Sequence, residues 1–82
     1  LSLHDALPIF MSELIKNLTW NKKIEVLRTI KGWTQDETAE KCFTGRKTYW
    51  GWESGTFYPR KNSRRAIAQA FGVKEEEIFG EE

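Results

Sequence analysis

The stretch TGRKTYWGWESG, residues 44–55, sets two cations beside three large aromatic side chains. Arg46 and Lys47 can donate hydrogen bonds to phosphate oxygens or to the acceptor edge of guanine, so the pattern suits an anionic polymer. On a helix that turns about 100° per residue, Tyr49 and Trp52 fall on one side and are expected in the core. The other side is expected to face outward, and it carries Arg46, Lys47, Trp50 and Gly51.

This outward side admits two interpretations. On a DNA-binding helix, the cations would meet phosphates or base edges, Trp50 would add an apolar contact, and the glycine would allow close approach. On an ordinary surface helix, the same residues would form a solvated charged face with Trp50 folded onto a neighbour, since single exposed aromatic residues are common. Periodicity alone does not separate the two.

The chain offers no set of residues suited to catalysis or metal binding. The sequence holds no general base with a partner, no cluster of metal ligands and no glycine loop that could cradle a phosphate. Asp36, Glu37 and Glu40 fit the solvated face of a helix, and Cys42 fits small apolar filling in a core. We therefore expect no enzyme, no catalytic residue, no metal and no cofactor.

Cysteine usage and charge point to a particular setting. Cys42 is the single cysteine, and neither a long apolar run nor a signal-peptide pattern is present, so a cytoplasmic location without membrane contact is expected. Residues 11–73 hold 12 Lys/Arg against 6 Asp/Glu, whereas residues 74–82 hold one lysine against five glutamates. A basic body with an acidic end can mark a polyanion-binding face, although surface solvation gives the same split.

The first ten residues have an unusual origin. The segment LSLHDALPI back-translates to the end of a common short-read sequencing adapter, whose last base would begin the codon of Phe10. We interpret residues 1–10, which include His4, as translated adapter and Met11 as the start of the protein, against the alternative of a natural disordered leader. Residues 11–82 then form one small domain with a marginal core.

Helical periodicity dominates the remaining sequence. Apolar positions recur at helical spacing in segments that end at glycine, and Thr34 with Glu37 makes a capping-box pattern. Pro59 marks a loop, and Asn62 or Ser63 is expected to cap the helix that follows. We predict an all-α fold, a compact bundle of about five short helices. The expected segments are 20–32, 34–42, the 44–55 stretch, 62–72 and 74–80, with one or two more turns within 11–18.

The order and spacing of these features resemble a known family. From Trp33 to Val73 the chain resembles, without a gap, the helix-turn-helix domain of the Cro/repressor-like (XRE) family of bacterial and phage regulators, and the likeness extends over nearly all of residues 22–79. It implies a lambda-repressor-like fold whose third helix enters the major groove of duplex DNA. The matching residues are Arg28, Thr34, Gln35, Glu37, Ala39, Arg46, Thr48, Glu53, Gly55, Pro59, Ile67, Ala68, Ala70, Gly72 and Val73.

The resemblance also implies which residues contact DNA. The bases would be faced by Arg46, Lys47, Trp50 and Gly51. Phosphates would be contacted by Gln35, Thr48, Arg60, Lys61, Asn62 and Arg64, with Arg65 as an alternative to Arg64. Arg28 and Glu53 stand where the family pairs an arginine with a glutamate to tie the first helix to the third, so their implied role is structural.

Three positions depart from the family pattern. Phe43 occupies a turn position where glycine is usual, so we expect the turn to re-form around Gly45. Arg64 replaces a common leucine and is expected to reach outward or to contact phosphate. Gly51 supplies no side chain at a position that often reads a base, so specificity is expected to be modest or to depend on DNA shape.

These features favour a sequence-specific, double-stranded-DNA-binding transcriptional regulator. We expect a small prokaryotic or phage repressor that binds the major groove as a weak homodimer. The alternative is an antitoxin or anti-repressor of the same fold, in which Trp50, Phe57 and Tyr58 contact a protein partner. Binding to random duplex DNA at low salt distinguishes the two hypotheses.

Overall fold

Five helices and their short connections make up the part of the chain that the structure describes. The structure is a computed structural model, and it describes residue 13 and residues 15–80. The prediction of an all-α fold is confirmed, because no strand occurs in this part of the chain. The interpretation of residues 1–10 as translated adapter lies outside the described residues. The helices are α2 (Trp20–Lys31), α3 (Gln35–Lys41), α4 (Arg46–Glu53), α5 (Lys61–Phe71) and α6 (Glu75–Phe79).

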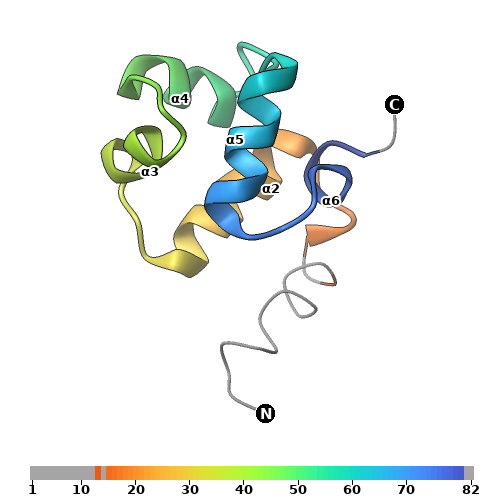
Figure 1. The fold of residues 1–82 in the computed structure, drawn as a ribbon. Helices are drawn as coiled ribbons and strands as arrows, with labels where there is room; N and C mark the ends of the chain where they lie inside the picture. Colours follow the sequence, from red (N-terminus) through yellow and green to blue (C-terminus); the bar gives the residue numbers. More distant parts are fainter. Residues whose placement is uncertain (1–12, 14, 81–82) are drawn as a thin grey trace.

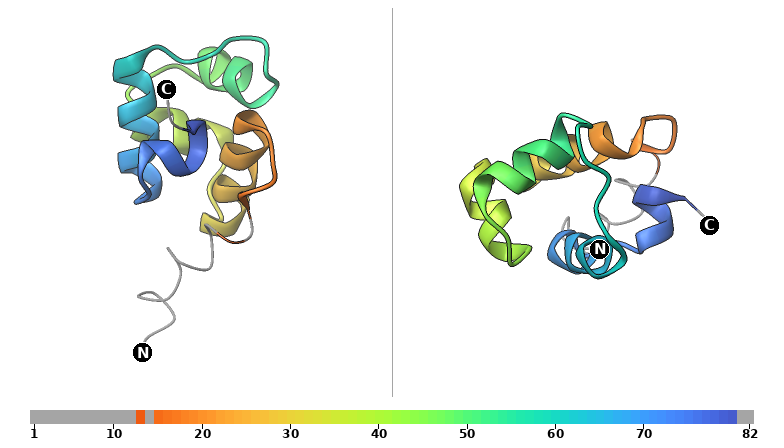
Figure 2. Two further views of the ribbon diagram at one scale, coloured as in Figure 1. Left: turned by 90° about the vertical axis from the view of Figure 1, so that its right-hand side faces the viewer. Right: turned by 90° about the horizontal axis from the view of Figure 1, so that it is seen from above.

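The helices surround one core and leave α4 at an edge of the molecule. In Figure 1, α3 and α4 form a corner at the upper left, α2 and α5 run through the middle, and α6 closes the opposite side. The left-hand view in Figure 2 shows α4 and the loop that leads to α5 along one edge of the described part of the chain. Among the described residues, this arrangement leaves one long side of α4 without a neighbouring helix.

The core is built from one face of each helix. Tyr49 and Trp52 are 0% and 4% exposed, so their prediction as core anchors is confirmed. The Trp33 ring stacks on that of Phe71 with centroids 5.8 Å apart. Thr38 is buried beside the small residues of α3, which lets α3 and α4 approach closely. The other buried apolar residues are Ile15, Ile24, Leu27, Ala39, Cys42, Ile67, Ala68 and Ile78.

A second aromatic group holds the α4–α5 loop against the rest of the domain. The Tyr58 ring meets Trp20 edge-on, with centroids 5.1 Å apart, and meets Phe79 at 5.8 Å. Pro59, the next residue in the loop, is fully buried. The loop is therefore fixed between α2 and α6, and this fixes where α5 begins.

Helices α2 to α5 all end in a Schellman motif. In this motif a residue just after the helix adopts a left-handed conformation, and two backbone amides donate to the last free carbonyls of the helix. Glycine takes that position after α2, α4 and α5, whereas Phe43 takes it after α3 with φ 60°. The amides of Phe43 and Thr44 donate to the carbonyls of Glu40 and Ala39 at 3.1 and 2.9 Å. The expectation that the turn re-forms around Gly45 is wrong, because these two bonds require Phe43 to be left-handed.

The start of α5 also differs from the prediction. Arg60 is the N-cap residue and no side chain caps the helix, so Asn62 and Ser63 lie within its first turn. Proline fixes the backbone at residue 59, and the chain turns directly into the helix after the extended Arg60. In contrast, the Thr34–Glu37 capping box at α3 is confirmed, with both of its hydrogen bonds present.

Candidate nucleic-acid interface

The outward side of α4 carries side chains that project into solvent. Arg46 and Lys47 are exposed, and Trp50 retains 52% of its accessible surface, so its predicted outward orientation is confirmed. Arg46 lies 3.6 Å from the Asp36 carboxylate, but both side chains are about two-thirds exposed. A surface pair of this kind is weak and salt-sensitive, so it leaves the guanidinium available to another anion.

Gly51 does not belong to the exposed surface, and its expected place facing bases is wrong. The residue is buried, because the ring of Phe57 from the following loop lies over it. A Cβ added to Gly51 would overlap Phe57 Cδ2 and would stand only 2.5 Å from Cε2. The glycine thus allows close approach, but of a phenylalanine of its own chain rather than of DNA.

Glu53 connects α4 to two other helices. Its carboxylate accepts hydrogen bonds from Arg28 of α2, with Nε–Oε2 at 2.5 Å and Nη2–Oε1 at 3.2 Å. The two side chains are 5% and 19% exposed, and the carboxylate raises the pKa of the guanidinium. Asn21 Nδ2 adds a bond to the Glu53 carbonyl at 3.2 Å. These contacts hold the end of α4 against α2, as expected for a structural pair.

Gln35 takes part in the same network. Its Nε2 donates to Glu53 Oε1 at 3.2 Å, so the amide points toward the α3–α4 contact. The first turn of α3 also carries Asp36 and Glu37, and the Thr34 amide lowers the pKa of the Glu37 carboxyl. The sequence alone did not reveal this use of Gln35, because residues 35 and 53 meet only in the folded chain.

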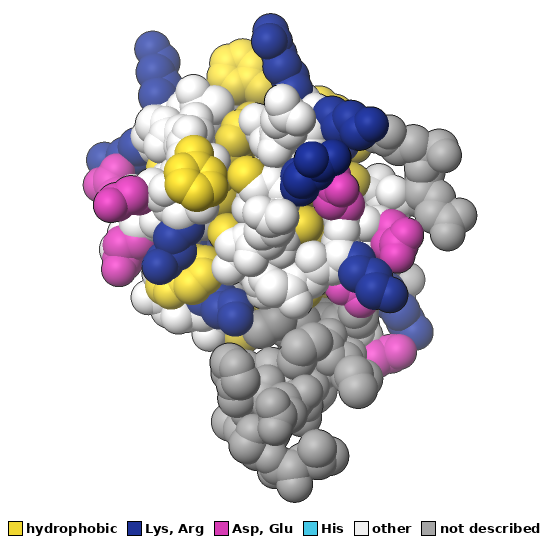
Figure 3. Space-filling model, in the orientation of Figure 1, with side chains coloured by type: hydrophobic (Ala, Val, Ile, Leu, Met, Phe, Trp, Pro, Cys, Tyr) yellow, Lys and Arg dark blue, Asp and Glu magenta, His cyan; other side chains and the backbone are white. Residues whose placement is uncertain are grey.

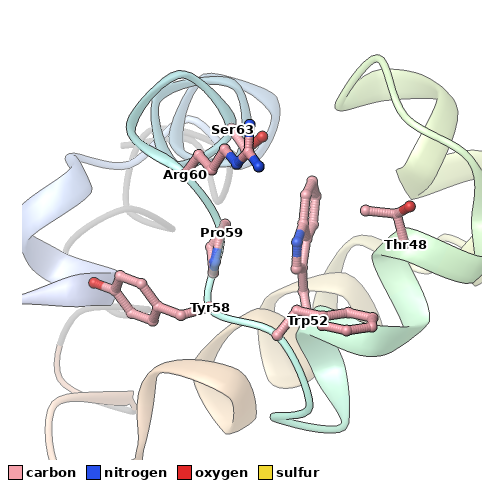
Figure 4. A pocket seen from close by; sticks show the side chains of 7 residues that line it. Thr48, Trp52, Tyr58, Pro59, Arg60 and Ser63 are labelled. Carbon is pink, nitrogen blue, oxygen red and sulfur yellow. The ribbon is translucent and has the colours of Figure 1, made fainter.

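A cleft beside α4 brings together residues from α4, the loop and α5. It has a volume of about 310 Å³, and Figure 4 shows Trp52 upright between Thr48 on one side and the Pro59–Ser63 segment on the other. Arg60 and Thr48 of the predicted phosphate contacts line this cleft, and Lys61 and Asn62 are exposed beside it. These four predicted phosphate residues therefore lie on or beside one continuous edge.

Arg64 is engaged with the loop. Its Nη1 donates to the Pro59 carbonyl at 2.9 Å, and its guanidinium lies 5.3 Å from the centre of the Tyr58 ring. The structure thus adds a contact with the loop that the sequence did not predict, and the expected contact of Arg64 with a phosphate stays a prediction. Arg65, in contrast, is exposed.

Charge is distributed unevenly over the surface. Figure 3 shows Lys and Arg side chains projecting along the upper edge, above α4 and the start of α5, with hydrophobic atoms between them. Acidic side chains gather over α3 and at the right-hand side of the same view. The upper edge therefore combines positive charge with apolar surface, which suits the phosphates and the base methyl groups of DNA.

Two reactive groups are removed from solvent. Burial raises the pKa of the Cys42 thiol to about 11, and burial together with the Glu53 carboxylate raises the pKa of the Tyr49 hydroxyl.

Among residues 15–80, no group of three acidic, histidine or cysteine side chains could hold a metal ion. No helix in the same range has the length and apolar character to span a bilayer.

The fold, the projecting basic helix and the turn before it define a DNA-binding helix-turn-helix domain of the Cro/repressor type. The chain belongs to this family, since the family model described as "Helix-turn-helix domain" matches residues 21–81. Over 66 residues the chain is 38% identical to the HTH-type transcriptional activator BcrR of Enterococcus faecalis. That stretch covers 79% of this chain and 32% of the relative, so the chain spans about a third of the relative's length. No solved structure gave a significant match.

Proposed function

We propose that this protein is a transcriptional regulator that places α4 in the major groove of a specific duplex DNA sequence. The observation that carries the proposal is the outward side of α4, where Arg46, Lys47 and Trp50 project from a helix fixed by Glu53. Arg46 and Lys47 would donate to guanine edges, and Trp50 would cover the methyl group of a thymine.

Phosphate contacts would flank α4 on one side. Thr48, Arg60, Lys61 and Asn62 lie along the edge that adjoins α4, at the uncapped N-terminus of α5. Free backbone amides and cations at a helix start both favour phosphate. On the other side, Gln35 would reach a phosphate with the part of its amide that does not bind Glu53. Arg64 would act by holding the loop, with any phosphate contact secondary to that role.

A domain of this size covers one half-site of DNA, so a symmetric site would need two copies. We propose a homodimer that is weak in solution and completed on DNA. Sedimentation of the protein with and without a two-half-site duplex tests this, with one copy expected on a half-site and two on the full site.

The first experiment selects binding sites from a random duplex library and measures affinity by fluorescence anisotropy. With about five phosphates neutralised, log affinity should fall against log salt with a slope of about −4.5. Arg46→Ala should relax preference at one base pair, whereas Arg60→Ala should weaken selected and scrambled duplexes alike. Lys16→Ala is the matched charge control, because this exposed lysine precedes α2 in the chain and forms an ion pair with Glu13 rather than with a residue of α4 or α5.

A protein-binding role is the second candidate, favoured by the half-exposed rings of Trp50, Phe57 and Tyr58. An affinity for duplex DNA that is absent at low salt, or indifferent to salt, would support this role and refute the first. The sign of regulation is a separate question. The family resemblance led us to expect a repressor, whereas the relative is named an activator, so a reporter gene carrying the selected site should measure both directions.

A further inference from the structure

The second turn of α4 presents two aromatic rings that come from different parts of the chain. Trp50 follows Arg46 by one turn, and Gly51 follows Lys47 by one turn, so the outward side of α4 has two columns. The first column ends in the indole of Trp50. The second column would end in bare backbone, but the ring of Phe57 lies over Gly51 and is itself 53% exposed.

The loop backbone fixes this ring in place. The amides of Thr56 and Phe57 both donate to the Gly51 carbonyl, at 2.9 and 3.2 Å. Ser54 Oγ donates to the same carbonyl at 3.1 Å and bonds to Thr56 Oγ1 at 2.8 Å. The Cδ2–Cε2 edge of the Phe57 ring lies against Gly51 of α4, and about half of the residue remains exposed beside α4.

We propose that Phe57 is a specificity-determining residue that reads the methyl group of a thymine in the major groove, at the place on α4 where Gly51 supplies no side chain. This inference rests on the proposed function. A phenyl ring offers no hydrogen bond to a base edge, and the thymine methyl is the apolar group of the major groove. The ring stands one helical turn beyond Lys47, so the thymine would neighbour the base pair that Lys47 contacts.

The test uses the full chain and the duplex selected from the random library. Each thymine is replaced in turn by deoxyuridine, which lacks only the methyl group. A buried methyl group corresponds to roughly a fourfold change in affinity. For the wild-type protein we expect such a loss at one position near the Lys47 contact, in addition to any position read by Trp50.

Phe57→Ala should abolish the loss at that one position and keep the response at the others. The matched control is Phe43→Ala, which removes an equally large, 88% exposed ring from another turn and should keep the wild-type profile. Gly51→Ala is the second variant, since its added methyl displaces the Phe57 ring without removing it, and it should lose the same discrimination.

The outcomes separate the two proposals. If the wild-type protein selects no DNA site, the proposed function fails. If it selects a site but Phe57→Ala keeps every deoxyuridine response, or weakens binding to thymine and deoxyuridine duplexes equally, Phe57 only packs on α4 and the inference is overturned while the function stands.

Discussion

Substituting Gly51 with alanine tests whether the Phe57 ring, and nothing else, occupies the space above this residue. In the middle of a helix, alanine stabilises by about 1 kcal/mol relative to glycine. The three atoms nearest to the added Cβ all belong to the Phe57 ring, so the ring must move. No backbone atom is among those three atoms, and the half-exposed ring can swing into solvent.

The size of the opposing effect follows from the exposure of the ring. Full burial of a phenylalanine is worth roughly 1.5–3 kcal/mol, and about half of Phe57 is buried, so displacing the ring costs about 1 kcal/mol. Gly51→Ala should therefore leave the free energy of unfolding nearly unchanged. In a Phe57→Ala background, where the space is already empty, the same change should stabilise the protein by about 1 kcal/mol.

Urea unfolding of the four proteins, the wild type, the two single variants and the double variant, measures this difference as a coupling of about 1 kcal/mol. The reasoning is refuted if Gly51→Ala destabilises the protein by the same amount in both backgrounds, because the obstruction would then come from groups other than Phe57.

Three further predictions concern the scaffold. Phe43→Gly should stabilise the domain by about 1 kcal/mol, because it removes the strain of a left-handed phenylalanine and loses little packing, since the ring is almost fully exposed. The expected result is a rise of several degrees in Tm, and an unchanged or lower Tm would contradict the prediction. Arg28→Ala should lower the free energy of unfolding by about 3 kcal/mol, because it leaves the buried Glu53 carboxylate without its cation. A double-mutant cycle with Glu53→Gln should show strong coupling between the two positions. The control is Lys22→Ala, which breaks an exposed pair and should lower the free energy of unfolding by less than about 1 kcal/mol. Burial raises the pKa of the Cys42 thiol from 9.0 to about 11, so between these pH values the unfolded chain loses this proton while the folded chain keeps it. The free energy of unfolding should therefore fall as pH rises from 9 to 11. Cys42→Ala should remove this contribution to the pH dependence of stability.

The sequence by itself determined the elements and the side of α4 that faces outward. Tyr49 and Trp52 are buried and Trp50 is exposed because a helix repeats every 3.6 residues, and this depends on local geometry alone. The capping box at Thr34 and the helix end at Gly72 were predictable for the same reason, since both are contacts between residues near in the chain. The pairing of Arg28 with Glu53 joins residues distant in the chain, and it was expected only from the family resemblance.

Only the tertiary structure decided what covers Gly51, where Gln35 and Arg64 point, and how the turn at Phe43 is formed. Helical spacing places Gly51 on the outward side, but the loop folds back and lays Phe57 over it, which no periodicity can reveal. A glycine inside a helix costs stability, so it could have signalled a close approach, but not the identity of the approaching group. The reason is physical: local backbone geometry sets the direction of each side chain, whereas its neighbours are set by how distant segments pack together.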